Sequence, residues 1–269
     1  MNVTLLEIKN LSKTFFHRIN FFKSQFLEAV KPLSFTLNSG ETLAIIGTNG
    51  SGKSTLARML AGVIKPTNGE IFVNGNKLNY GDYTYRSQHI RMIFQNPSTS
   101  LTPKQPIGKI LEIALILNTS LSIIDRENRI KETLRQVGLL ADHAEYYPHM
   151  LAEGQKQRAG LARALIVNPK IIIADEALAS LDMTTRSQII NLMIELQEKN
   201  GISYIYVTQN LGMMKHISDN VLVMNNGIIV ERGNTAEVLA APLHEVTRHL
   251  ISSHFGELLS ADSWHQDIT

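Results

Sequence analysis

One segment of the sequence combines closely spaced glycines with a lysine and a serine, a pattern that binds phosphate. Residues 47–54, G-T-N-G-S-G-K-S, fit G-x-x-x-x-G-K-[ST] and follow an apolar run at residues 42–46. Glycines let backbone N–H groups curve around phosphate oxygens, and the following helix directs its positive end at the anion. We expect Lys53 to contact the β- and γ-phosphates and the Ser54 hydroxyl to ligate Mg²⁺. The predicted nucleotide-binding residues here are Gly47, Thr48, Asn49, Gly50, Ser51, Gly52, Lys53, Ser54 and Thr55.

Two carboxylates stand at the end of another apolar run. Residues 171–176 read I-I-I-A-D-E. A buried strand would deliver Asp175 beside the nucleotide, where its carboxylate can hold Mg²⁺. Because successive side chains of a strand alternate in direction, Glu176 points differently and can polarise an attacking water as general base. Taken with the phosphate loop, this pattern predicts a site that binds a nucleotide with Mg²⁺ and places a general base beside its phosphates.

The elements that would position these residues alternate between strands and helices. Short apolar runs predict strands at residues 4–9, 34–37, 42–46, 70–73, 91–94, 171–174, 202–207 and 221–224. Helical patterns lie at residues 53–61, 107–117, 123–137, 155–166, 184–198 and 211–217. This order indicates an α/β fold with a mostly parallel sheet.

Two regions depart from that alternation. The chain up to about residue 90 is rich in strands and predicts an antiparallel β portion, whereas residues 100–165 predict a helical insertion. Residues 17–26, H-R-I-N-F-F-K-S-Q-F, mix basic residues with phenylalanines. We expect a β-hairpin loop whose Phe side chains pack inward; contact with a membrane surface is the alternative.

Composition excludes several classes of protein. The chain has 269 residues, 43% of them apolar, and no cysteine, which rules out disulfides, thiolate metal sites and cysteine nucleophiles. A net charge of +2 argues against a dedicated nucleic-acid binder. No apolar run is long enough to span a bilayer, and residues 1–10 do not resemble a secretory signal. We therefore expect a soluble cytoplasmic protein, and these observations leave attachment to a membrane through partners open.

Further motifs resemble the ATP-binding cassette (ABC) ATPases, specifically the branch that serves oligopeptide and dipeptide importers. Residues 151–158, L-A-E-G-Q-K-Q-R, resemble the LSGGQ signature, which only this family adds to a phosphate loop of this kind. The signature positions are Ala152, Glu153, Gly154 and Gln155. Residues 94–97, F-Q-N-P, resemble the Q-loop with Gln95, and 179–182, A-S-L-D, the D-loop with Asp182. Phe15 stands where the family places an aromatic ring that stacks on adenine.

The resemblance implies an architecture. It is a P-loop NTPase core of the ABC ATPase type, with an antiparallel β subdomain and an α-helical signature subdomain. The expected ABC ATPase domain covers residues 1–255. Its core with the β subdomain would take residues 1–95 and 166–232, its helical subdomain residues 96–165, and a C-terminal tail residues 256–269.

The resemblance also implies a multi-subunit transport complex. Two ATPases close head to tail over two ATP molecules, each site combining one subunit's phosphate loop with the other's signature. The implied partners are two transmembrane permease subunits, a second and different ABC ATPase, and, indirectly, a periplasmic substrate-binding protein. The chain would sit peripherally on the cytoplasmic face of the inner membrane and energise transport of oligopeptides or antimicrobial peptides. In this scheme Glu176, Gln95 and Gln209 act in catalysis, and Ser54, Gln95 and Asp175 place Mg²⁺.

The sequence departs from the family pattern at two places. Ala152 replaces the serine that normally bonds the γ-phosphate across the dimer, and Glu153 brings a negative charge towards it. Gln209 replaces the family's switch histidine and can donate a hydrogen bond but cannot carry a positive charge. Two alternatives therefore stay open beside the transport ATPase: a weakly hydrolysing regulatory subunit, and a soluble ABC ATPase with no membrane partner.

Overall fold

The described chain is built around a central β-sheet. The computed structural model describes residues 3–20, 23–94 and 101–255, so the predictions on Gln95 and on the tail 256–269 lie outside it. Six strands follow the order β10-β9-β3-β8-β7-β6, parallel except for the β9–β10 hairpin. The strands are β3 (Thr42–Gly47), β6 (Ile90–Ile93), β7 (Ile171–Asp175), β8 (Ser203–Val207), β9 (Asn220–Asn225) and β10 (Ile228–Asn234). The predicted parallel α/β sheet is thus confirmed.

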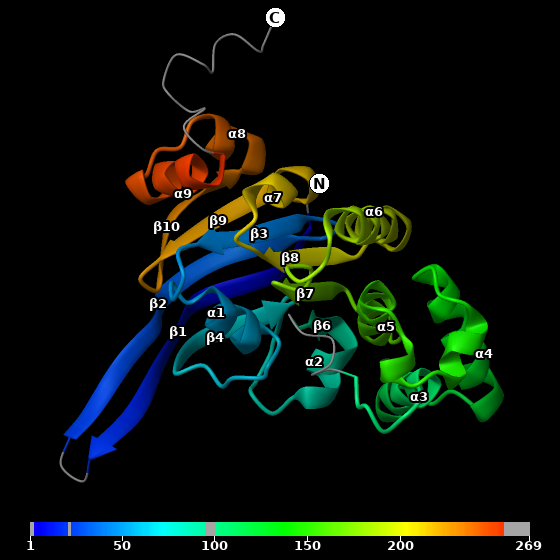
Figure 1. Cartoon of the computed structure of the whole chain (residues 1–269). Helices are drawn as coiled ribbons and strands as arrows, with labels where there is room; N and C mark the ends of the chain where they lie inside the picture. The colour runs from blue at the N-terminus through cyan, green and yellow to red at the C-terminus, as the bar shows by residue number, and fades with distance from the viewer. Residues whose placement is uncertain (1–2, 21–22, 95–100, 256–269) are drawn as a thin grey trace, which may run out of the picture.

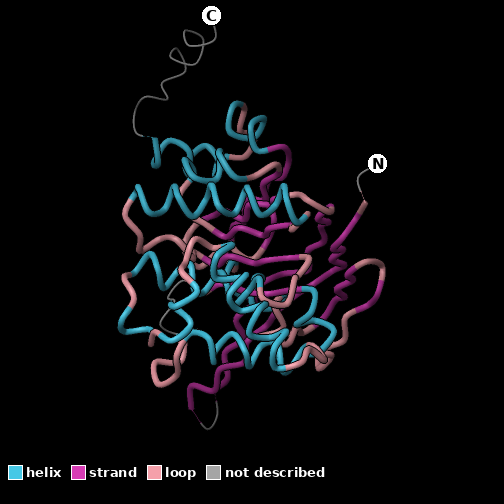
Figure 2. The backbone as a smooth tube through the Cα atoms, turned by 90° about the vertical axis from the view of Figure 1, so that its right-hand side faces the viewer, coloured by secondary structure: helices cyan, strands magenta, loops and turns pink. Residues whose placement is uncertain are grey.

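Alternate residues of the central strands enter different hydrophobic cores, because side chains along a strand point to opposite faces. In β7, Ile172 and Ala174 join the core on the side of α5 (Glu153–Leu165) and α6 (Met183–Asn200). Ile171 and Ile173 join the core on the opposite face, under α1 (Lys53–Leu60). Both faces are covered, which explains why these strands are apolar throughout. Figure 2 shows the helices and the strands between them.

A second sheet is antiparallel, as the strand-rich N-terminal region predicted. Its order is β2-β1-β4-β5, with β1 (Thr4–Asn20), β2 (Lys23–Asn38), β4 (Asn68–Val73) and β5 (Asn76–Lys77). The ends of β1 and β2 form a long two-stranded ribbon that projects from the body (Figure 1). The hairpin prediction for residues 17–26 is confirmed, but Phe26 is 70% exposed, so the expected inward packing is wrong at that residue. The ribbon has no core of its own into which a ring could turn.

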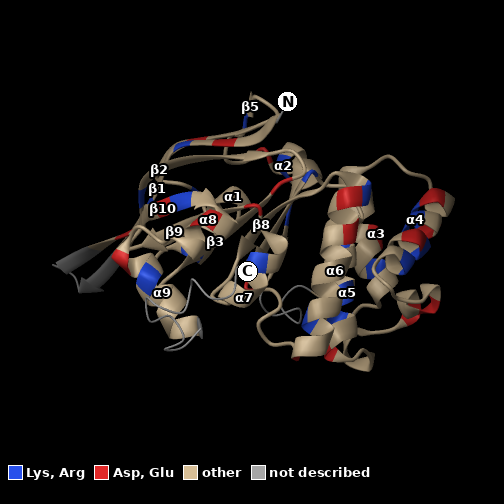
Figure 3. Cartoon of the chain, turned by 90° about the horizontal axis from the view of Figure 1, so that it is seen from above, with Lys and Arg blue, Asp and Glu red and all other residues tan. Residues whose placement is uncertain are grey.

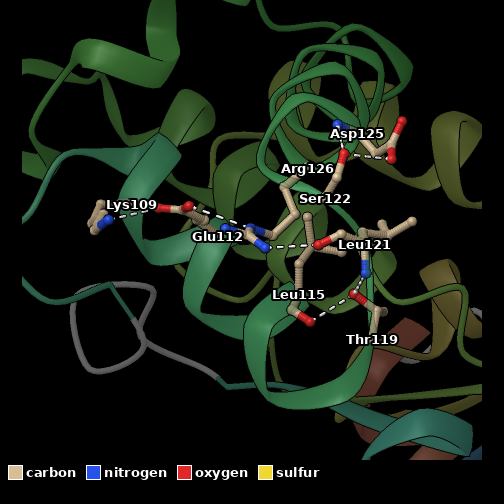
Figure 4. Close-up of polar contacts among 8 residues, drawn as sticks. All are labelled: Lys109, Glu112, Leu115, Thr119, Leu121, Ser122, Asp125 and Arg126. Atoms are coloured by element: carbon tan, nitrogen blue, oxygen red, sulfur yellow. Dashed lines mark hydrogen bonds and ion pairs between the residues drawn. The ribbon is translucent and has the colours of Figure 1, made fainter.

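Residues 101–165 are largely helical, as expected. They contain α3 (Ile107–Asn118), α4 (Ile123–Gln136) and α5, with short 3-10 turns at Ala141–Glu145 and Pro148–Met150. Figure 4 shows the connection between α3 and α4. The Ser122 hydroxyl caps α4 by accepting from the backbone N–H of Asp125, and Arg126 bonds the Leu121 carbonyl and the Glu112 carboxylate. Figure 3 shows the charged residues along α4.

Several elements have no counterpart in the sequence-based prediction. They are α2 (Tyr83–His89), β5, β10, α8 (Thr235–Ala240) and α9 (Glu245–Phe255). Helix α7 (Leu211–Ile217), which was predicted, packs with α8 and α9 into a third apolar cluster that includes Leu211, Met214 and Ile251. Among the described residues, none of the helices combines the length and hydropathy needed to cross a bilayer.

Candidate functional site

The phosphate loop lies between the centre of the large sheet and α1. Strand β3 is buried along its whole length between β8 and β9, so the loop that follows it starts from a fixed point. Gly47 and Gly52 have φ angles of 145° and 101°, which favour glycine. A Cβ at Gly47 would overlap the carbonyl oxygen of Met224, and one at Gly52 would overlap that of Ala29. Only glycine fits these two positions.

The ammonium group of Lys53 is buried inside this loop. Its Nζ donates to the carbonyl oxygens of Gly47 at 2.9 Å and Thr48 at 2.8 Å, and lies 3.4 Å from the Ser51 hydroxyl. Burial lowers the pKa of Lys53, while the nearby carboxylates of Glu176 and Asp175 oppose that shift. The loop therefore holds a cation that already faces oxygen acceptors.

A buried carboxylate meets the first turn of α1. The Ser54 hydroxyl donates to Asp175 Oδ1 at 2.8 Å, although 121 residues separate the two in sequence. Burial raises the pKa of Asp175, and the hydrogen bond from Ser54 and the charge of Arg58, whose Nε lies 4.0 Å from Oδ2, pull it back down. A hydroxyl and a carboxylate beside a phosphate-binding loop are the ligands that Mg²⁺ takes in proteins together with substrate phosphates. The described residues therefore fit Mg²⁺ and a polyphosphate.

Glu176 follows β7 in a left-handed backbone conformation. Its φ is 49°, uncommon outside glycine, and its N–H donates to the Val207 carbonyl on the neighbouring β8. Gln209, just past the end of β8, donates from Nε2 to Glu176 Oε1 at 2.7 Å. Because β7 and β8 are parallel neighbours, their carboxyl ends bring these two side chains together. Strained backbone of this kind is often found at active sites.

Gln209 stands in the wall between two cavities. One, of 240 Å³, is lined by Glu176, Arg186 and Tyr206 among others. The other, of 280 Å³, is lined by residues 47–49 of the phosphate loop and by His254 of α9. His254 and Arg58 are site residues that the sequence reasoning missed. Arg58 lies one turn beyond Ser54 on α1, a position that its helical spacing could have revealed; His254 lies on a helix that was not predicted.

The signature residues lie at the start of α5. The backbone N–H of Ala152 donates to Gln155 Oε1 at 2.9 Å, and Glu153 pairs with Lys156 at 3.5 Å. A Cβ at Gly154 would come within 2.7 Å of the Thr185 side chain. The first two contacts lie within the start of α5, and the absence of a side chain at Gly154 allows Thr185 of α6 to approach it closely.

The remaining predicted residues occupy separate places. Asp182 caps α6 by accepting from the backbone N–H of Thr185 at 3.0 Å, and this bond holds the pKa of Asp182 below its ordinary value. Phe15 lies at the base of the ribbon, with Lys13 Nζ 5.0 Å from its ring centroid and bonded to the Lys65 carbonyl. Gln95 lies outside the described residues, so the structure does not place it.

Known proteins are similar to this chain in sequence, and others are similar in fold. The family model for ABC transporters matches residues 30–179. The "Putrescine export system ATP-binding protein SapF" of Escherichia coli K12 is 68% identical over 264 residues, 98% of each chain. The "Peptide transport system ATP-binding protein SapF" of Salmonella typhimurium matches equally well. The dipeptide transport ATP-binding protein DppF of Escherichia coli K12 is 40% identical over 87% of this chain and 71% of its own.

Solved structures give the same answer for the fold. The cassette cbiO1 from Clostridium perfringens, part of the transporter complex cbiONQ, has a TM-score of 0.76 at 29% identity, covering 88% of this chain and 91% of its own. The cassette MJ0796, solved as a dimer bound to ADP and Pi, has a TM-score of 0.75 at 28% identity, over 86% and 99%. The P-loop NTPase fold expected from the sequence is therefore confirmed. With a phosphate loop, an acidic strand end and these relatives, the chain belongs to the ABC transporter family, as one of its ATPase components.

Proposed function

We propose that the chain is the ATP-hydrolysing subunit that drives a multi-subunit transporter of the inner membrane. The observation that carries the proposal is the 2.8 Å hydrogen bond between Ser54 and Asp175. It places the only buried carboxylate of the described site against the phosphate loop, next to the Lys53 ammonium.

Each residue then has a defined task. Lys53 exchanges its loop carbonyls for phosphate oxygens, and residues 47–55 supply N–H donors. Ser54 and Asp175 would hold Mg²⁺, which supplies charge neutralisation on the phosphates when bound; Gln95 is proposed as a further ligand. Glu176 takes a proton from the attacking water, and the Gln209 amide fixes the orientation of its carboxylate. The Phe15 ring stacks on adenine.

The proposed partners are those that the resemblance to the family implies. The signature residues Ala152–Gln155 would contact ATP held by a second, different ABC ATPase, and Asp182 would communicate between the two sites. Two permease subunits would dock on the helical subdomain, where a cavity of 420 Å³ lies between β6, α2 and α3. The chain would thereby sit on the cytoplasmic face of the inner membrane, with a periplasmic binding protein acting on the far side.

The transported compound is proposed to be a peptide. Relatives named for peptide transport match at 68% and, in the dipeptide systems, at 40% identity. Putrescine is the second candidate, because the relative from Escherichia coli K12 carries that name at the same 68% identity.

A weakly hydrolysing regulatory subunit is a second candidate function. Ala152 has no hydroxyl for the partner's γ-phosphate, and loss of a hydrogen bond to a charged acceptor typically costs about 1.5–3 kcal/mol. Gln209 is uncharged at the position of the switch histidine. Turnover of the assembled complex separates the two candidates.

The test is a pull-down followed by activity measurement. A tagged chain is isolated from gently solubilised membranes, and its partners are identified by mass. We expect polytopic subunits and a second cassette ATPase; recovery of ribosomes or nucleic acid would instead support a soluble role. The complex is then placed in proteoliposomes, where ATP hydrolysis should require Lys53, as shown by Lys53→Ala. Stimulation by peptides against stimulation by putrescine identifies the substrate class.

A further inference from the structure

The end of the β1–β2 ribbon stands away from the rest of the described chain. We define the ribbon as residues 14–20 of β1 and 23–28 of β2, paired from Thr14–Glu28 onward. Strand β4 accompanies β1 only as far as Ser12, and the Thr14 N–H donates to the Thr67 hydroxyl at 3.0 Å. Beyond that point β2 is the strand that pairs with β1, and six residues of extended chain reach about 20 Å. Figure 1 shows this ribbon extending from the body.

Two aromatic rings lie on one side of the ribbon, in water. Phe16 and Phe26 are directly opposite each other in register, with ring centroids 5.3 Å apart and planes tilted by 59°. Their exposed fractions are 60% and 70%, and the neighbouring Leu27 is 62% exposed. A two-stranded hairpin is only marginally stable by itself in water, and clustered exposed apolar side chains mark interaction sites. The pair therefore has the form of a contact surface.

The composition of the segment identifies the kind of contact. The ribbon residues include two basic residues, Arg18 and Lys23, against one acidic residue, Glu28, and three phenylalanines, Phe15, Phe16 and Phe26. Phe and Leu side chains on the apolar side of an interfacial segment bury at the boundary between the headgroups and the acyl chains of a bilayer. Basic residues add about 1 kcal/mol each near an anionic lipid surface. Binding in the groove of a protein partner would require a surface of complementary shape. This segment instead presents aromatic rings and a net positive charge, which suit a lipid surface.

We propose that Phe16 and Phe26 insert into the headgroup region of an anionic membrane, so that the ribbon contacts lipid directly. This contact goes beyond the proposed ATPase role and does not depend on it. It would give the chain a membrane attachment separate from the permease subunits. The ribbon that makes this contact begins at Thr14, next to Phe15.

The experiment uses the full chain and vesicles. Binding is measured by cosedimentation with phosphatidylcholine vesicles that contain about one third phosphatidylglycerol, and with pure phosphatidylcholine vesicles. We expect binding to the anionic vesicles that weakens at high salt, and a loss of about tenfold in the Phe16→Ser/Phe26→Ser variant. The matched control is Ile124→Ser/Leu243→Ser, which removes two side chains that are 70% and 81% exposed, one on α4 and one between α8 and α9, and should bind normally. Thermal melting and ATP affinity confirm that each variant is folded.

Three results would overturn the proposal. The aromatic variant could bind anionic vesicles as well as the unchanged chain does. It could lose copurification with the permease subunits while vesicle binding is unaffected, which would assign the pair to a protein partner. Light scattering could reveal a dimer of the chain that disappears in the variant, which would assign the pair to a second copy. An absence of ATP hydrolysis would contradict the proposed function. It would not affect the interpretation of the vesicle-binding measurement.

Discussion

At the scale of single residues, the Gln209 amide could either orient the Glu176 carboxylate or bind the nucleotide. Substitution of Gln209 distinguishes these two roles. If the amide orients the carboxylate, Gln209→Ala should lower kcat by about tenfold while the KM for ATP changes little, since a hydrogen bond to a charged group is worth about 1.5–3 kcal/mol. Steady-state hydrolysis by the isolated complex measures both constants.

The adjacent Asn210 provides a control for this substitution. Its side chain accepts from the backbone N–H of Met213 and caps α7, so Asn210→Ala affects helix stability and leaves the contact to Glu176 in place. A raised KM with unchanged kcat in Gln209→Ala would mean that the amide serves the nucleotide rather than the carboxylate.

Burial makes the charged form of Asp175 unfavourable in the folded chain and raises the pKa of this carboxyl group. Because burial raises its pKa above the ordinary Asp value, the folded chain is penalised at neutral pH and relieved as the pH falls towards about 4. Asp175→Asn keeps an acceptor for Ser54 and removes the charge. We expect it to raise the melting temperature by about 2–4 °C, for a gain of about 1 kcal/mol, more at neutral than at acid pH.

The same variant should lose stabilisation by Mg²⁺-ATP, which scanning calorimetry measures in parallel. Asp182→Asn is the matched control, since Asp182 is an exposed cap whose pKa is lowered and whose replacement by Asn still caps α6. A melting temperature that falls in Asp175→Asn would show that the carboxylate contributes to folding as well as to metal binding.

At the scale of the elements, the loop between β3 and α1 depends on two close approaches of backbone. In Gly47→Ala the added methyl meets the Met224 carbonyl, so β9 and the loop must separate. We expect ATP affinity to fall more than about tenfold, with a lower melting temperature. Gly40→Ala is the control: Gly40 has φ 74° but open space around it, so only left-handed strain of about 1–2 kcal/mol applies. Equal ATP affinities in both variants would contradict this account.

The elements also show what the sequence could predict. The helix at residues 53–61 is observed at Lys53–Leu60, and the helix at residues 107–117 at Ile107–Asn118, because both have clear periodicity and are bounded by glycine or proline. Helices α2 and α8 are short and lack a full apolar stripe, so periodicity had little to detect.

The candidate site likewise contains residues that the sequence could predict and contacts that it could not. The residue pattern identified Lys53, Ser54, Asp175 and Glu176, since each follows a strand or opens a helix. The hydrogen bond from Gln209 to Glu176 forms because β7 and β8 are neighbours in the sheet. The residues of the two strands do not reveal the order of the strands in the sheet. The Phe26 error has a related cause: inward packing assumes a core, and a projecting ribbon has none.

At the scale of the whole molecule, the phosphate loop and the signature are carried by different cores. Lys53 opens α1 on one face of the sheet, while Ala152–Gln155 open α5 on the other. In the composite site that we propose, the signature beside this phosphate loop would come from a second cassette. Glu176→Gln, isolated with its partner ATPase, should form a stable closed dimer with ATP, with twice the 30.0 kDa mass for a partner of similar size.

Light scattering with ATP and with ADP measures this association. The Lys53→Ala/Glu176→Gln variant should stay dissociated, because it lacks the lysine that binds the phosphates. Rapid turnover of ATP by Glu176→Gln would remove Glu176 from the role of base.

When a nucleotide binds, the Lys53 ammonium must exchange hydrogen bonds within its own loop for hydrogen bonds to phosphate. Two carbonyl oxygens and a hydroxyl of its own loop already surround the ammonium, and a phosphate must displace them. The heat of this step is the difference between the bonds to these neutral acceptors and the stronger bonds to charged phosphate oxygens. Calorimetry of ATP binding would therefore record, for this lysine, only the part of the phosphate contact that exceeds the loop contacts it gives up.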